Sequence, residues 1–177
     1  MKRSLVIPAT IAILVAAAIA SAILLVGSGP SSASPAVAPS PCGPNAVALY
    51  GHIKSLTPKG DSFEMRFDPA WLLSGVTASR AKLEDTGSSD VPNDNYVVEE
   101  GHRLLTYLVP TTAHVTVLTS GGALDSSGFP SKVITVSQLA QLVNGERPVK
   151  LYESLDTGFR MHVNIDTVCS LEHQYRP

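Results

Sequence analysis

The chain has 177 residues, enough for one folded domain and an additional segment, with 13 basic and 15 acidic side chains. Without Lys2 and Arg3 at its start, 11 basic residues oppose the 15 acidic ones, a formal charge of −4. This acidic balance argues against nucleic-acid binding, because contacts with phosphates require an excess of basic side chains.

The first element is an apolar segment from Leu5 to Val26 that contains no charged residue. A helix of this length measures roughly 33 Å and can cross a hydrocarbon core of about 30 Å. Its length favours an uncleaved transmembrane helix, with residues 1–4, which include Lys2 and Arg3, in the cytoplasm. The alternative is a signal segment that is cleaved near Ser31–Ser34 or after Ala38. In both interpretations the rest of the chain lies outside the cytoplasm.

Residues 27–41 are rich in Gly, Ser, Pro and Ala and predict a disordered linker, because they cannot bury enough apolar surface to fold. The folded domain is expected to span residues 42–177. Cys42 and Cys169, the only cysteines, lie near its two ends. In an oxidising compartment such a pair predicts a disulfide, and the alternative is two separate thiols.

Two extended segments open this domain. Residues 44–56 predict a long strand with a bend or bulge at Gly51. Residues 62–68 alternate strictly between apolar and polar side chains, as in a half-buried strand. The segment between them has turn residues, so we expect a hairpin.

A helical insert is expected at residues 69–95. An Asp-Pro pair at its start is typical of a helix N-cap and first turn, so residues 70–74 predict a short helix. A second helix is expected over residues 78–85 and ends at Gly87. A polar loop then completes the insert.

Strands and loops follow the insert. Residues 96–109 predict a hairpin that turns at Glu100 and Gly101, and residues 113–119 return to the extended pattern. Residues 120–132 are rich in Gly and Ser and predict a mobile loop.

The last part of the chain predicts one helix and two strands. The segment TVSQLAQLVNG predicts a compact helix, which Ser137 can cap and which an Asn-Gly pair ends. Residues 147–154 and 159–171 predict the final strands, joined by a turn at LDTG.

This mainly β order resembles a small OB-like Greek-key β-barrel with one short helix between the third and fourth strand regions. The motifs that carry the resemblance are VALYGHIKSLTPKGDSFEMRF, HVTVLT, VSQLAQLVNGERPVKLYES and RMHVNI. It covers residues 45–170 without the insert. The whole chain resembles uncharacterised membrane-anchored or secreted actinobacterial proteins, a group with no established activity. The resemblance therefore implies a location and a fold, and no chemistry.

Trp71 is the only tryptophan and stands at the start of the insert. Because Trp is enriched at interface hot spots, Trp71 is a candidate anchor for a partner, with Arg80 and Lys82 as polar rim residues. The alternative is that Trp71 pins the insert onto the barrel. The leading hypothesis is a non-enzymatic extracytoplasmic binding module for an envelope protein or cell-wall polymer, without a cofactor.

His162, Asn164 and Asp166 share one face of the predicted last strand, because side chains two residues apart point the same way. Imidazole with carboxylate suits a transition metal, so the alternative function is a small extracellular metal-dependent enzyme that uses His162 and Asp166. The ligand set is incomplete, however. We therefore expect the polar row to face water, opposite a buried row of Met161, Val163 and Ile165.

Two further groups carry potential chemistry. The oxygen-rich segment 84–95 is compatible with Ca²⁺, but its spacing does not match an EF-hand loop. The predicted hairpin tip, residues 99–103, combines carboxylates with His102 and Arg103, but an exposed turn does not shift pKa values as acid–base catalysis requires. Nucleophile and phosphate-loop motifs are absent.

Overall fold

The computed structural model describes residues 42–99, 101 and 103–176. The expected cytoplasmic end, the transmembrane or signal helix and the linker, residues 1–41, lie outside the described residues. Within the described part, no helix is both long enough and apolar enough to cross a membrane.

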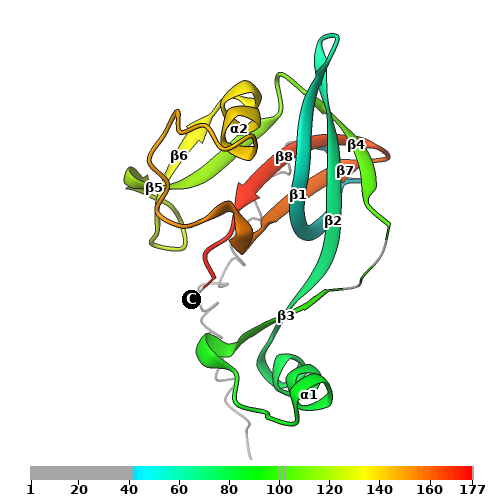
Figure 1. Ribbon diagram of the computed structural model, residues 1–177, viewed down its shortest axis with the longest axis vertical. Helices are drawn as coiled ribbons and strands as arrows, with labels where there is room; N and C mark the ends of the chain where they lie inside the picture. Colours follow the sequence, from blue (N-terminus) through cyan, green and yellow to red (C-terminus); the bar gives the residue numbers. More distant parts are fainter. Residues whose placement is uncertain (1–41, 100, 102, 177) are drawn as a thin grey trace, which may run out of the picture. The chain divides into compact units, whose positions relative to one another are not determined.

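The described part is mainly β, as the sequence predicts, with eight strands in one sheet and two helices (Figure 1). The strands are β1 (Val47–Lys59), β2 (Ser62–Ser74), β3 (Asn95–Glu99), β4 (Leu105–Pro110), β5 (His114–Leu124), β6 (Pro130–Ile134), β7 (Phe159–Asn164) and β8 (Thr167–His173). The helices are α1 (Gly75–Thr86) and α2 (Val136–Val143).

Five of these strands close into a ring. β1 pairs with β2 and β7, β7 pairs with β8, and β4 connects β2 to β8, which it meets in parallel. The ring order is therefore β1-β2-β4-β8-β7. β5 joins β8 in parallel and carries β6, so that β3 and β6 form the edges of the described sheet.

The alternating pattern of β2 builds one wall of the core, as the sequence predicts. Phe63, Met65 and Phe67 are buried, together with Leu56 from β1. The register shift of this hairpin lies between Ile53 and Ser55 instead of at the expected Gly51.

Gly51 has a different role from the predicted bulge. A Cβ atom at this position would collide with the carbonyl oxygen of Asp68 and the ring of Phe67. Gly51 therefore allows the two strands to approach closely at this point.

The prediction of a helix over residues 70–74 is wrong. These residues continue β2, and residues 70–74 pair with residues 95–99 of β3. Asp68, the expected N-cap, forms an ion pair with Lys54 at 3.0 Å instead. Backbone pairing with a strand that arrives twenty residues later therefore overrides the local helix signal.

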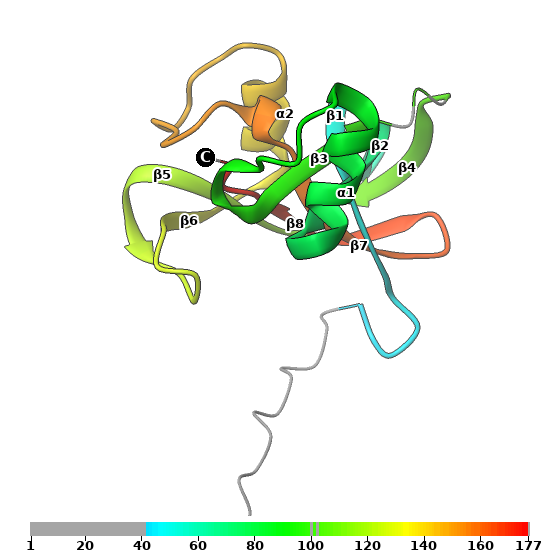
Figure 2. The same ribbon diagram turned by 90° about the horizontal axis from the view of Figure 1, so that it is seen from below.

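The second expected helix is present as α1, which packs against β2 and β3 (Figures 1 and 2). It begins at Gly75, three residues before the predicted start. It ends as predicted, because Gly87 adopts a left-handed φ of 77° and donates its N–H to the carbonyl of Leu83.

The predicted hairpin over residues 96–109 is also wrong. β3 and β4 do not pair with each other; they pair with successive parts of the same β2 edge. β2 has 13 residues, so its edge is long enough for both short strands. The expected turn therefore lies between two segments that run in the same direction.

The Gly/Ser segment predicted as a mobile loop forms a strand pair. β5 extends to Leu124, and β6 returns after a tight turn. The carboxylate Oδ1 of Asp125 accepts the N–H groups of Ser127 at 2.8 Å and Phe129 at 3.1 Å. An Asp side chain that bonds its own turn in this way stabilises a hairpin connection.

Helix α2 confirms its prediction but uses a different cap. The hydroxyl of Thr135 accepts the Gln138 N–H at 3.1 Å, and the Gln138 side chain accepts the Thr135 N–H at 3.0 Å. This capping box replaces the expected Ser137 cap. Leu139 and Leu142 form the buried apolar stripe of this helix.

The final strands differ from the sequence prediction. Residues 147–154 form a loop with a single bridge between Leu151 and Thr119. Gly145 and Pro148 near the start of this loop favour a turn. Residues 159–171 form the β7–β8 hairpin. Its turn contains Ile165, which has a φ of 60° and is 93% exposed, so Ile165 does not belong to the core.

The predicted disulfide between Cys42 and Cys169 is present, with Cα atoms 5.3 Å apart and a sequence separation of 127. It ties the start of the domain to β8. On the chain-entropy model, closure of so long a loop stabilises the fold by about 4–5 kcal/mol.

Candidate functional site

Trp71 lies on the outward continuation of the core face of β2. Residues two apart on a strand share a face, so Trp71 follows Phe63, Met65 and Phe67 along one row. The first three side chains are buried, whereas Trp71 is 58% exposed. The apolar face of β2 therefore continues beyond the closed ring into solvent.

A groove of about 420 Å³ surrounds Trp71. We call it the Trp71 groove; its lining residues are Ala48, Leu49, Tyr50, Pro69, Ala70, Trp71, Leu72, Leu105 and Arg160. These come from β1, β2, β4 and β7. Leu105 is also 40% exposed, so the groove presents contiguous apolar side chains to solvent.

Two polar groups border this apolar surface. The hydroxyl of Tyr50 donates to the carbonyl of Thr157 at 2.6 Å, and burial raises the pKa of Tyr50 above its ordinary value. Arg160 is exposed and forms no ion pair or side-chain hydrogen bond with the residues that the structure describes. Its guanidinium is therefore available to a partner.

The structure does not place the predicted rim residues at this groove. Arg80 and Lys82 lie on α1 and are absent from the groove lining. Arg80 forms an ion pair with Glu84 at 2.7 Å, one helical turn away. The Lys82 ammonium donates to the carbonyl of Asp90 in the following loop. Both cations thus stabilise the insert itself.

The polar row of the last hairpin does not converge on one point. His162 Nδ1 lies 3.0 Å from the hydroxyl of Ser170 on β8. Asn164 is exposed at the end of β7, and Asp166 in the turn accepts the Thr167 hydroxyl at 3.1 Å. Across the described residues, no group of three His, Cys, Asp or Glu side chains could hold a metal ion.

In the oxygen-rich segment 84–95, the carboxylates of Glu84 and Asp85 interact with nearby protein side chains. The carboxylate of Glu84 pairs with Arg80, and the carboxylate of Asp85 accepts the Tyr96 hydroxyl at 3.2 Å. In the predicted turn, the carboxylate Oε1 of Glu99 lies 3.1 Å from Nε2 of His52 on β1. His102 lies outside the described residues.

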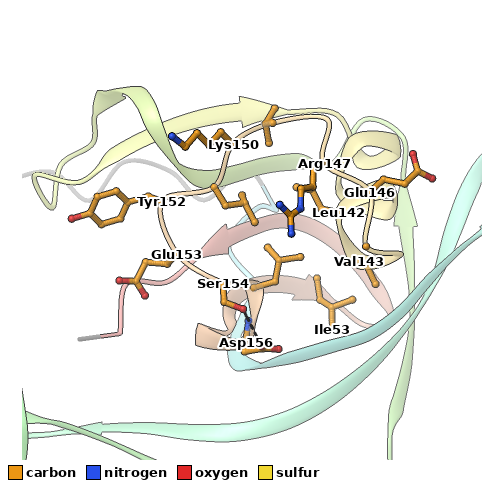
Figure 3. A pocket seen from close by; sticks show the side chains of 14 residues that line it. Ile53, Leu142, Val143, Glu146, Arg147, Lys150, Tyr152, Glu153, Ser154 and Asp156 are labelled. Carbon is orange, nitrogen blue, oxygen red and sulfur yellow. Dashed lines mark hydrogen bonds between the residues drawn. The ribbon is translucent and has the colours of Figure 1, made fainter.

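A second hollow lies beside the C-terminal end of α2 (Figure 3). This cavity of about 760 Å³ is lined by α2, Ile53 of β1 and residues between 145 and 156. We call residues 145–157 the cavity loop. The apolar lining of the cavity consists of Ile53, Leu142, Val143, Val149, Leu151 and Leu155, all of which belong to the core cluster or pack against it. Its charged lining residues are Glu146, Arg147, Lys150, Glu153 and Asp156.

His173 holds the end of the cavity loop. This side chain is 5% exposed, and its Nε2 lies 2.9 Å from the Ser154 carbonyl and 2.8 Å from the Thr157 hydroxyl. Its Nδ1 accepts the Leu118 N–H at 3.4 Å, and its ring stacks on Phe159. The accepting Nδ1 identifies the neutral Nε2–H tautomer, and burial lowers the pKa of His173.

Sequence reasoning missed the cavity because residues 147–154 predict a strand. A strand would have distributed these side chains over two faces of the sheet. The available signal was the Gly-Glu-Arg-Pro run at residues 145–148, which is typical of a turn.

No family model, curated protein or solved structure matches the chain.

Proposed function

We propose that this chain is a non-enzymatic binding module of the cell envelope. The first 26 residues would anchor it in the membrane or direct its secretion, and an OB-like Greek-key barrel would be presented outside the cytoplasm. The module would bind an envelope protein through the Trp71 groove.

Two observations support the barrel. The ring order β1-β2-β4-β8-β7 closes the sheet on itself, as barrels require. Helix α2 lies in the chain between β4–β5–β6 and β7–β8, which matches a short helix before the last hairpin.

The disulfide supports the location. Disulfides persist in oxidising compartments outside the cytoplasm and are rare within it. The bond between Cys42 and Cys169 therefore agrees with the span-length apolar segment at residues 5–26, which predicts export of the domain.

The exposure of Trp71 is the observation that carries the binding hypothesis. A large aromatic ring on the face of β2 that is buried at Phe63, Met65 and Phe67 leaves apolar area in contact with water. Trp, Tyr and Arg are the residue types most enriched in interface hot spots, and the groove combines Trp71, Tyr50 and Arg160. This composition favours a protein segment as the occupant.

Site-specific photo-crosslinking in native membranes tests this proposal. A photoreactive residue is placed at position 71 and, as a control, at Val133, which is 57% exposed on β6. We expect one envelope protein to be crosslinked from position 71 and not from position 133. That protein is then purified for equilibrium binding to the domain.

We expect Trp71→Ala to weaken this binding by about tenfold or more, because truncation of an aromatic hot spot removes at least one decade of affinity. Val133→Ala should leave binding unchanged, and both variants should melt near the wild-type temperature. Crosslinks from position 71 only to cell-wall polymer would contradict a protein partner. A large loss of thermal stability in Trp71→Ala would show that Trp71 pins the insert instead.

A further inference from the structure

The cavity beside α2 combines an apolar base with a guanidinium that pairs with no side chain among the described residues. Ile53, Leu151 and Leu155 form part of the base and pack against the core. Figure 3 shows the guanidinium of Arg147 directed from the loop towards the interior of the cavity, which Ile53 also lines. Arg147 makes no ion pair or side-chain hydrogen bond with any residue that the structure describes.

The carboxylates of the cavity loop form no contact ion pair with Arg147 among the described residues. Figure 3 shows Glu146 and Glu153 pointing away from the guanidinium. Asp156 accepts the hydroxyl of Ser154 at 2.8 Å, and no ion pair between Arg147 and these carboxylates is present in the described part. The positive charge therefore lies next to apolar surface and is available to an anion.

We propose that this cavity binds a free, single-chain amphiphilic anion. The carboxylate would accept a bidentate pair of hydrogen bonds from Arg147, which planar guanidinium groups favour. The alkyl chain would lie on Ile53, Leu151 and Leu155 and leave water. A cavity of about 760 Å³ is within the range of roughly 300–1,000 Å³ that small-molecule sites occupy.

The site is separate from the Trp71 groove, with which it shares no lining residue. The charged linings also differ: Arg147, Lys150 and three carboxylates surround the apolar base of the cavity, whereas Arg160 is the only charged lining residue of the Trp71 groove. The inference therefore does not depend on the proposed protein partner.

Titration of the domain with decanoate, followed by methyl NMR and calorimetry, tests this site. We expect decanoate to shift the methyl signals of Ile53, Leu151 and Leu155 and to leave Leu105 in the Trp71 groove unchanged. Decanol, which has the same chain and no charge, should bind at least tenfold more weakly, because it lacks the charge-assisted hydrogen bonds.

Arg147→Gln should reduce decanoate affinity by about tenfold and leave decanol affinity unchanged. Arg103→Gln is the matched control, because Arg103 is also exposed and lies outside the cavity lining. Arg147→Lys should retain part of the affinity, since it keeps the charge without the bidentate geometry.

Three results would overturn the inference. The first is equal affinity for decanoate and decanol, and the second is loss of decanoate binding in Arg103→Gln as large as in Arg147→Gln. The third is Arg147-dependent binding to anionic phosphatidylglycerol vesicles without binding of monomeric decanoate, which would assign Arg147 to a lipid surface.

Discussion

At the scale of single residues, His173 connects the cavity loop to the sheet. Its ring is buried against Phe159, and its two nitrogens bond Leu118 of β5 and the Ser154–Thr157 end of the loop. Protonation would place a hydrogen on Nδ1 opposite the Leu118 N–H, so both groups would be donors. The fold therefore favours neutral His173.

We predict that His173 makes the domain less stable in mild acid. Burial lowers the pKa of His173 in the folded state below its ordinary value of about 6.5. At a pH below about 6.5, the unfolded chain therefore binds a proton at this residue while the folded chain does not. The stabilisation that neutral His173 gives to the fold is complete above a pH of about 6.5 and is lost as the pH falls towards the folded-state pKa. Urea unfolding at pH 7.5 and pH 5.5 measures it.

The control for this prediction is His173→Gln, which cannot titrate. This variant should be less stable than wild type at pH 7.5, because it loses buried hydrogen bonds. The decrease in its unfolding free energy between the two pH values should be smaller than in wild type. An equal decrease in both proteins would contradict the role of His173.

The sequence was informative about residues whose chemistry is local. It identified Cys42 and Cys169 as a pair, and it singled out Trp71 as a candidate contact residue, which the structure leaves 58% exposed. It failed at Ile165, where alternation predicted burial, because a left-handed turn residue removes this side chain from the strand. The sequence also could not predict that Arg147 lines a cavity, because Ile53, which lies far away in the sequence, forms part of the same lining.

At the scale of elements, the agreement between sequence and structure depends on the range of the contacts. Helix α2 is defined by its own capping box and apolar stripe, and it was predicted within a few residues. The second half of β2 is defined by β3, which arrives after α1. No local pattern contains that information, so the Asp-Pro signal predicted a helix there.

We predict that Thr135→Ala lowers the free energy of unfolding by about 1 kcal/mol, because it removes the N-cap of α2. Ser137→Ala, at the cap that the sequence alone indicated, should change it by less than half as much. Chemical denaturation of the two variants measures both values. The reverse order would show that the capping box does not stabilise α2.

At the scale of the whole molecule, the disulfide joins the two ends of a ring that already closes through backbone pairing. The bond connects residue 42, just before β1, to Cys169 on β8. The fold class could be predicted because strand-forming segments dominate the sequence. The order of the ring could not, since the pairing of β4 with β8 joins segments about sixty residues apart.

We predict that replacement of both cysteines by serine reduces the free energy of unfolding by roughly 4–5 kcal/mol. Reduction of the wild-type bond should give a similar decrease, and both forms should retain mainly β circular dichroism in the absence of denaturant. A decrease of less than about 1 kcal/mol in both forms would show that the ring holds together without this crosslink.

The central claim is that the Trp71 groove is a binding surface. Trp71 is the only tryptophan, so 5-hydroxytryptophan incorporated into this chain reports on the groove separately from the tryptophans of a partner. The most direct measurement is quenching of that fluorophore by acrylamide, with and without the envelope protein crosslinked from position 71. We predict ready quenching in the free domain and strong protection in the complex. Equal quenching in both states, with the partner at saturation, would contradict the claim.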